Sequence, residues 1–113
     1  MVPPEGPSSP RSRAPTFYVY ILRCADDSYY VGHAEDVYAR IALHNAGRAA
    51  SWTSLRRPVT LAYSEPVGAH SDAIRRERQL KGWSRAKKEA LIAGYLVQLK
   101  ELSRCRLQHE QHR

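Results

Sequence analysis

The chain has 113 residues, a formal net charge of +7 and 42% hydrophobic residues. This length suits one domain with a single modest core. The basic balance favours a polyanionic partner, nucleic acid first and an anionic membrane surface second, although solubility alone also accounts for positive charge. Cys24 and Cys105 lack the spacing of a disulfide scaffold or a zinc cluster. No apolar run approaches the ~20 residues of a membrane span, so a cytoplasmic protein is expected.

The first 15 residues differ in composition from the rest. They hold five of the seven prolines, together with serines and two arginines. This composition predicts a disordered lead-in over residues 1–15, and the segment has no hydrophobic signal sequence.

Two aromatic strands, 17–24 and 29–33, are expected to form a hairpin, because aromatic and β-branched residues flank a turn-type cluster. Side chains alternate along a strand, so the pairing register decides whether Tyr20 and Tyr30 share a face. A three-residue loop over 25–27 puts both phenols on one face, and a two-residue loop puts them on opposite faces. Since a common site needs both phenols together, we predict the three-residue loop.

A short helix should follow the hairpin, capped by Asp36 and ended by Gly47. One stripe of this helix, at i, i+3, i+4 and i+7, holds Val37, Arg40, Ile41 and His44. The two apolar members dock the helix, and the other two bring a permanent cation and a titratable imidazole to the same side. Either both face a site, or Arg40 snorkels from the edge of the stripe and His44 is an ordinary surface residue.

The segment 47–58 is expected to be a loop with basic residues around an aromatic one, namely Arg48, Trp52, Arg56 and Arg57. Such a combination suits a phosphate backbone and a stacked base. The alternative is that Trp52 anchors the loop to the core while the arginines are only solvated. His33, directly after the second strand, is a further candidate for contact with a phosphate or a tyrosine.

A third strand is predicted over 59–64, with alternating apolar residues, and Pro66 and Gly68 should end it. Ser71 is expected to cap the next helix, and Gly82 to end it. One of its faces should hold Ala73, Ile74, Glu77 and Leu80.

Glu77 therefore falls inside an apolar stripe. A carboxylate in that position is costly unless it is paired or bound to a cation. An internal ion pair with Arg40 or Lys81 would satisfy it, and so would a metal ion.

A last helix should begin at Ser84, with Gly94 as a place where it bends or breaks. Residues 16–93 would make the compact domain, and residues 94–113 a helical extension and tail that packs on the domain or offers a partner surface. The elements run β-β-α-β-α-α. This order predicts an α/β fold in which a three-stranded antiparallel sheet flanked by helices buries one core.

The motifs over roughly residues 17–92 resemble those of the GIY-YIG nuclease superfamily, in particular its small stand-alone bacterial members. The matching residues are Tyr18-Val19-Tyr20, Tyr30-Val31-Gly32, the helical Arg40 and His44, and Glu77 after the third strand. The run Gly-x-x-x-Ser-Trp-Thr-x-x-Arg-Arg-Pro-Val is similar to a loop of the same proteins. Tyr18 stands where the family name has its first glycine, a residue that small relatives often lack.

This resemblance implies a GIY-YIG-like fold and a metal-dependent endonuclease that hydrolyses phosphodiester bonds in DNA, in settings such as DNA repair. Glu77 would be the ligand of one Mg²⁺ or Mn²⁺ ion, and Arg40 would bind the scissile phosphate. Tyr20 or Tyr30 would take the proton of the attacking water, and either phenol would require nearby cations to lower its pKa. In the favoured assignment Tyr20 is the base. Tyr30 would position water or phosphate, and His44 would share the proton transfer or hold the phosphate.

Two other classes of protein fit the same residues. One is a nucleic-acid-binding module with this fold and little or no catalysis, which would retain the basic residues. The other is a protein-interaction adaptor that uses the C-terminal helix.

Overall fold

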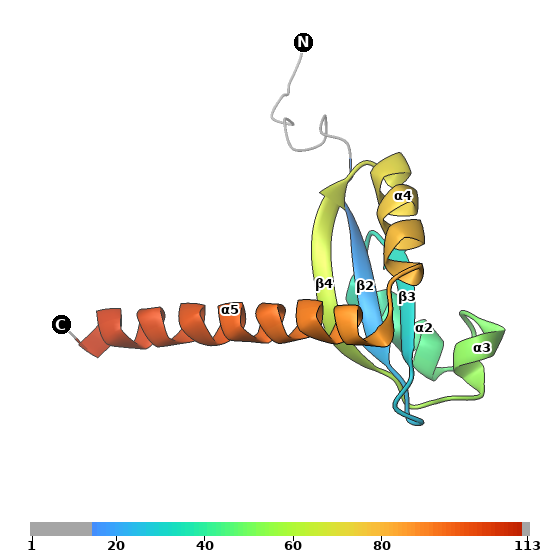
Figure 1. Ribbon diagram of the computed structural model, residues 1–113, viewed down its shortest axis with the longest axis horizontal. Helices are drawn as coiled ribbons and strands as arrows, with labels where there is room; N and C mark the ends of the chain where they lie inside the picture. The colour runs from blue at the N-terminus through green and yellow to red at the C-terminus, as the bar shows by residue number, and fades with distance from the viewer. Residues whose placement is uncertain (1–14, 112–113) are drawn as a thin grey trace, which may run out of the picture.

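The computed structural model describes residues 15–111, with α5 described by its backbone alone beyond residue 101. The elements are β2 (Phe17–Arg23), β3 (Tyr29–Ala34), α2 (Val37–Asn45), α3 (Ser51–Ser54), β4 (Thr60–Gly68), α4 (His70–Lys81) and α5 (Arg85–Gln111), as Figure 1 shows. The predicted lead-in lies outside the described residues except for Pro15. The short helix α3 lies in the segment that was expected to be a loop.

The three strands form one antiparallel sheet in the order β3-β2-β4. Tyr20 pairs with Gly32, and Leu22 pairs with Tyr30, so the predicted register is confirmed. Asp27 at the end of the three-residue loop has a φ of 73°, the left-handed conformation that such loops require at that position. The predicted fold class, an α/β protein with a three-stranded antiparallel sheet and flanking helices, is confirmed.

Strand β4 differs from its prediction in extent and in pattern. It continues through Pro66 to Gly68, and it tolerates the proline because it is an edge strand. The register of its pairing with β2 shifts by one residue at Ala62. Leu61 pairs with Leu22 and Tyr63 pairs with Ile21, so Ala62 has no partner in β2. A bulge of this kind moves the residues beyond it to the other face.

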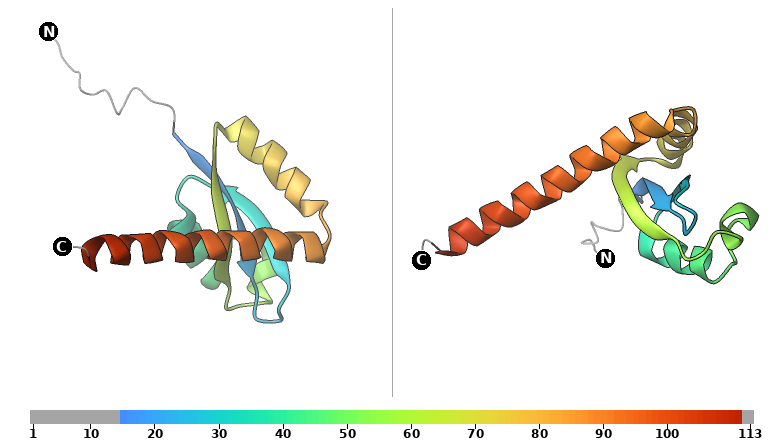
Figure 2. Two further views of the ribbon diagram at one scale, coloured as in Figure 1. Left: turned by 60° about the vertical axis from the view of Figure 1, so that its left-hand side comes forward. Right: turned by 60° about the horizontal axis from the view of Figure 1, so that its bottom comes forward.

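The sheet is covered on both faces (Figure 2), so the expectation of a single core was wrong. On the face covered by α4 and α5, side chains of the strands and of both helices form one buried cluster: Val19, Ile21, Val31, Tyr63, Ala73, Leu80 and Ile92. On the face of α2 lie Tyr20, Leu22, Cys24, Ala34, Val37 and Val59. Strand β2 is central and contributes to both clusters, because its successive side chains alternate between the faces.

The ends of α2 follow the prediction. The Asp36 carboxylate accepts a hydrogen bond from the Ala39 N–H at 3.0 Å. At the other end Gly47 has a φ of 75°. The Gly47 and Arg48 N–H groups donate to the carbonyls of His44 and Leu43 at 3.0 and 2.9 Å, the paired bonds of a Schellman motif.

Helix α4 runs from His70 to Lys81 and its N-cap is Ala69, so the prediction of Ser71 as the cap was wrong. The reason is Asp72, whose carboxylate accepts from the Ala69 N–H at 3.2 Å and so caps the helix from inside its first turn. Gly82 is the C-cap, as predicted. Ile74 does not join the buried face, because it is 40% exposed.

Helix α5 begins after Ser84, whose Oγ accepts from the Lys87 N–H at 3.1 Å. It passes Gly94 without a break. Its first part packs on the sheet through Ile92, and its C-terminal part extends away from the sheet (Figure 1). On the projecting part, Leu96, Val97 and Leu99 are exposed. Within the described part of the chain, every helix is too short or too polar to cross a membrane.

Candidate active site

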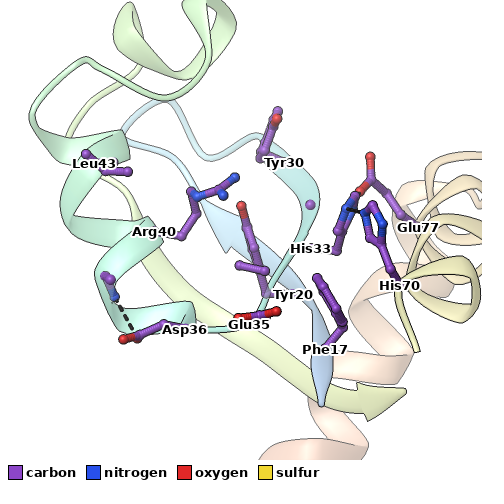
Figure 3. A pocket seen from close by; sticks show the side chains of 13 residues that line it. Phe17, Tyr20, Tyr30, His33, Glu35, Asp36, Arg40, Leu43, His70 and Glu77 are labelled. Carbon is purple, nitrogen blue, oxygen red and sulfur yellow. Dashed lines mark hydrogen bonds and ion pairs between the residues drawn. The ribbon is translucent and has the colours of Figure 1, made fainter. Parts of the chain in front are cut away.

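A cavity of about 530 Å³ lies along the edge strand β3, with α2 on one side and α4 on the other (Figure 3). Of the predicted site residues, it is lined by Tyr20, Tyr30, His33, Arg40 and Glu77. Strand β3 contributes one side chain from each face of the sheet. Tyr30 and His33 are three residues apart, so they point to opposite faces. The fold therefore brings together residues that are widely separated in the sequence.

Gly32 makes room for the Tyr20 phenol. The two residues pair across the strands, and a Cβ at position 32 would lie 2.6 Å from Tyr20 Oη. Any larger residue would push the phenol out of its place, so the last glycine of the motif has a steric role.

The Tyr20 hydroxyl contacts His44, which is only 1% exposed. Tyr20 Oη lies 3.1 Å from His44 Nε2, and His44 Nδ1 lies 2.8 Å from Thr53 Oγ1. The interpretation of His44 as an ordinary surface residue was therefore wrong.

The hydrogen bonds of Thr53 determine where the proton of His44 sits. Thr53 Oγ1 donates to the Ala50 carbonyl at 3.0 Å, so it accepts from His44 Nδ1–H. In a neutral imidazole the other nitrogen then carries a lone pair. Tyr20 O–H donates to that lone pair on Nε2.

Both members of this pair are neutral near pH 7. Burial raises the pKa of the Tyr20 phenol above its ordinary value, with a further contribution from Tyr30, and the Arg40 guanidinium only partly opposes this. Burial lowers the pKa of His44, and Arg40 acts in the same direction. The protein groups around Tyr20 therefore do not lower its pKa, as a free phenolate base would require.

Arg40 lies on the wall of the cavity that α2 forms. Its guanidinium points toward the Tyr20 hydroxyl in Figure 3. Because the side chain is exposed, its charge remains accessible to an anion that enters the cavity.

Glu77 is held by two partners from opposite sides. Its Oε1 lies 2.5 Å from His33 Nδ1, and its Oε2 lies 2.7 Å from Lys81 Nζ. Burial tends to raise the pKa of this carboxyl, but Lys81 and His33 outweigh burial and hold the pKa below its usual range. The carboxylate is thus ionised at neutral pH, and the predicted ion pair with Lys81 is present.

No group of three or more His, Cys, Asp or Glu side chains is arranged around a metal position in the described residues. A metal ion in this cavity would therefore take few protein ligands. Glu77 is the predicted one.

The 47–58 segment reaches the cavity through Trp52, which contacts the cavity-lining Tyr30. Trp52 stacks on Tyr30 with ring centroids 6.0 Å apart, and Arg56 lies 4.0 Å above the Trp52 ring. Trp52 is nevertheless 39% exposed. It therefore both anchors the segment and leaves part of its ring accessible, which combines the two predicted alternatives.

The three arginines of this segment differ in their contacts. Arg56 donates to Asp26 at 3.2 Å and to the Trp52 carbonyl at 2.9 Å. Arg57 donates to the Ser54 carbonyl at 2.8 Å. The Arg48 guanidinium has no hydrogen bond or ion pair within the described residues, so it is free to meet a ligand.

Three residues of the site were missed from the sequence. Thr53 is fully buried and fixes His44, although it belongs to the Ser-Trp-Thr run that pointed to the family. Asn45 accepts from the Val59 N–H at 2.7 Å and donates to the Val59 carbonyl at 3.0 Å, which ties α2 to the start of β4. His70 lines the cavity beside His33, and nothing in its sequence neighbourhood indicated that position.

Known proteins match the same part of the chain. Residues 16–90 match the family described as GIY-YIG catalytic domain. The UPF0213 protein SH2523 of Staphylococcus haemolyticus is 49% identical over 75 residues, which are 66% of this chain and 92% of that protein. The UPF0213 protein VNG_2274C of Halobacterium salinarum is also 49% identical over 75 residues, covering 66% of this chain and 97% of that protein.

A solved structure agrees with the fold. The solution NMR structure of the protein EF2693 from E. faecalis superposes with a TM-score of 0.51 at 29% identity, over 75% of this chain and 91% of that one. Together with the match over residues 16–90, these similarities show that the chain belongs to the GIY-YIG family, alongside the UPF0213 proteins.

Proposed function

We propose that this chain is a divalent-metal-dependent endonuclease that hydrolyses phosphodiester bonds in DNA. The observation that carries the proposal is the convergence of a hydrogen-bonded tyrosine, an accessible arginine and an ionised glutamate on one cavity. Phosphodiester hydrolysis needs a group that takes a proton from water, a cation at the phosphorus and stabilisation of the leaving oxygen. Tyr20, Arg40 and Glu77 match these needs.

Arg40 is the phosphate-binding group in this proposal. Its guanidinium points into the cavity from α2 and can form two parallel hydrogen bonds to phosphate oxygens. Such donors stabilise the negative charge that grows on the phosphoryl group in the transition state. Tyr30, which lies on the same face of the sheet as Tyr20, would position the phosphate or the attacking water.

Tyr20 acts as the base through His44. As the Tyr20 oxygen takes a proton from water, its own proton passes to the lone pair on His44 Nε2, 3.1 Å away. The resulting imidazolium keeps its other proton on Nδ1, which still donates to the Thr53 hydroxyl oxygen. This route needs no free phenolate, so it is compatible with the raised pKa of Tyr20.

The donor at the metal site in this proposal is Glu77. An ionised carboxylate suits Mg²⁺ or Mn²⁺, and Mg²⁺ often takes only one or two protein carboxylates because it retains several waters. Lys81, which now pairs with Oε2, is 51% exposed and can turn to solvent when a cation arrives. The bound ion would supply charge stabilisation at the phosphate and the leaving oxygen.

The DNA strand would lie across the cavity and the adjoining 47–58 segment. Trp52 offers a ring for base stacking, while His33, Arg48, Arg56 and Arg57 offer positive or hydrogen-bonding groups to the backbone. Arg56 and Arg57 would bind the DNA backbone in addition to their hydrogen bonds within the protein, which stabilise the conformation of the segment.

A nucleic-acid-binding module with little or no catalysis is the second candidate. The observation in its favour is that both carboxylate oxygens of Glu77 are already engaged, by His33 and Lys81. In that case the charged residues bind DNA, and the cavity stabilises the fold without recruiting a metal.

Cleavage of branched, single-stranded and duplex DNA in Mg²⁺, Mn²⁺ or EDTA separates the two candidates. The nuclease proposal predicts nicking that depends on the metal and disappears in Glu77→Ala. The matched control is Glu89→Ala, which removes an exposed glutamate of α5 outside the cavity. Equal traces of cleavage in wild type and Glu77→Ala would identify a contaminant, and DNA binding without cleavage would favour the binding module.

A further inference from the structure

Two histidine rings face each other at one end of the cavity. His33 Nε2 and His70 Nε2 lie 3.1 Å apart, one on β3 and the other at the first residue of α4 (Figure 3). Both rings are also held from behind. Glu77 contacts His33 Nδ1, and Phe17 stacks on His70 with centroids 4.8 Å apart and an interplanar angle of 26°.

The spacing of the two nitrogens is close to that of two ligands on one metal ion. Imidazole nitrogens bind Zn²⁺ at about 2.0–2.1 Å, so two of them at a tetrahedral angle lie about 3.3–3.4 Å apart. The observed 3.1 Å requires a shift of only a few tenths of an ångström. Without a metal, the two nitrogens share a proton, with one N–H donating to the lone pair of the other ring.

The contact of Glu77 with His33 has the form of a metal-supporting hydrogen bond. Histidines that bind a metal usually donate their second ring N–H to a carboxylate, which fixes the tautomer and strengthens the ligand. Here the carboxylate holds the proton on Nδ1 and leaves Nε2 of His33 directed at His70. The contacts of His33 with His70 and Glu77 thus match the arrangement of two metal ligands and a supporting carboxylate.

We propose that His33 and His70 form a two-histidine binding site for Zn²⁺ or a neighbouring transition-metal dication, with Glu77 as the orienting carboxylate. Imidazole selects such ions over Mg²⁺. Water completes the coordination, because residues 15–101 provide no cluster of three His, Cys, Asp or Glu ligands. The site is open, since His33 is 26% exposed and His70 is exposed. It goes beyond the proposed nuclease function and does not depend on it.

Isothermal titration of the full chain with Zn²⁺ alone tests the site without any measurement of cleavage. We expect one Zn²⁺ per chain, and a loss of affinity of at least about tenfold in His33→Ala and in His70→Ala. Glu77→Gln, which keeps the volume of the side chain but removes its charge, should weaken binding by roughly tenfold.

The matched control removes the other close histidine pair in the sequence, His109 and His112. The double variant His109→Ala/His112→Ala should bind Zn²⁺ like the wild type. Equal affinity in the wild type and His70→Ala, or loss of binding in the control variant, would overturn the proposal.

A second measurement keeps the test independent of how the variants fold. Zn²⁺ added to ¹⁵N-labelled wild-type protein should shift the imidazole Nε2 signals of His33 and His70 and leave those of buried His44 in place. Shifts confined to other histidines would contradict the site. Since neither measurement uses DNA, failure of the zinc site and failure of the nuclease proposal are separate results.

Discussion

Thr53 shows how one buried residue can define the chemistry of another. Its hydroxyl has a single proton, which goes to the Ala50 carbonyl, so it acts on His44 only as an acceptor. That constraint leaves a lone pair on the nitrogen that faces Tyr20. A residue without a hydroxyl at position 53 would no longer fix the tautomer of His44, so Nε2 would not be held as the acceptor for the Tyr20 hydroxyl.

Replacement of Thr53 by Val should therefore cost both stability and activity. Val has nearly the same shape but no acceptor, so the buried His44 N–H loses its partner, at a cost of about 1–3 kcal/mol. Urea unfolding measures this loss. Thr53→Ser, which keeps the hydroxyl, is the control and should retain most of the stability. Equal unfolding midpoints for the Val and Ser variants would contradict the role of the hydroxyl.

The lowered pKa of His44 predicts a pH dependence of stability. Burial, together with Arg40, holds this pKa below the ordinary value of 6.5 in the folded state. As the pH falls below about 6.5, the unfolded chain takes up the proton first, so the stability present above that pH is lost progressively toward the folded-state pKa. The urea midpoint should thus fall more between pH 7.5 and 5.5 in wild type than in His44→Gln. Parallel pH dependences would show that His44 does not titrate in this way.

At the scale of the elements, the sequence was most informative where local chemistry acts alone. The ends of α2 followed from Asp36 and Gly47, which depend on neighbours in the chain. Alternation along the strands limited the hairpin to two registers, and the need for Tyr20 and Tyr30 on one face decided between them.

The misses depend on contacts between distant segments. The bulge at Ala62 arises only when β4 pairs with β2. The burial of His44 arises only when α3 brings Thr53 against α2. The meeting of His33 with His70 requires the packing of α4 on β3. Family resemblance supplied the roles of Tyr20, Arg40 and Glu77, and the sequence already offered Lys81 as a partner for Glu77. The contact of Tyr20 with His44 and that of Glu77 with His33 became visible only in three dimensions.

Gly32 gives an element-scale prediction, because it sets how closely β2 and β3 can place the Tyr20 ring. In Gly32→Ala the new Cβ would lie 2.6 Å from Tyr20 Oη. We expect a loss of about 1–3 kcal/mol from overpacking, together with slower cleavage. Urea unfolding and a cleavage assay measure the two effects.

Gly94→Ala is the matched control for this substitution. A Cβ at position 94 meets nothing within 4 Å, and the residue lies inside α5. Alanine should stabilise the helix by about 0.5–1 kcal/mol. If both variants changed stability in the same direction, the steric role of Gly32 would be refuted.

At the scale of the whole molecule, the site depends on a sheet that is covered on both faces. Edge strand β3 lies between α2 and α4, so Arg40 from one layer and Glu77 from the other line the same cavity. The chain carries a formal net charge of +7, which would draw a nucleic acid toward the protein.

The arginines of the 47–58 segment should separate binding from stability. Arg48→Ala removes a guanidinium without a partner in the described residues, so we expect weaker DNA binding at unchanged stability. If Arg48 contacts one phosphate, the slope of log K against log salt should decrease in magnitude by about 0.9. Fluorescence anisotropy at several salt concentrations measures the slope. An unchanged slope would place Arg48 outside the interface.

Arg57→Ala is the informative comparison. It removes hydrogen bonds to the Ser54 and Asn45 carbonyls, at 2.8 and 3.4 Å, and should therefore lower both binding and the free energy of unfolding. A variant that lost binding alone would show that these contacts do not hold the segment.

The most direct test of the proposed mechanism is the single-turnover rate of DNA cleavage in Mg²⁺ for Tyr20→Phe. The mechanism predicts a loss of roughly 10²–10⁴-fold, because the group that passes the water's proton to His44 is gone. Tyr38→Phe, a tyrosine of α2 that is 77% exposed, should cleave like the wild type. Circular dichroism would verify that both variants are folded. A folded Tyr20→Phe protein that cleaves at the wild-type rate would contradict the account.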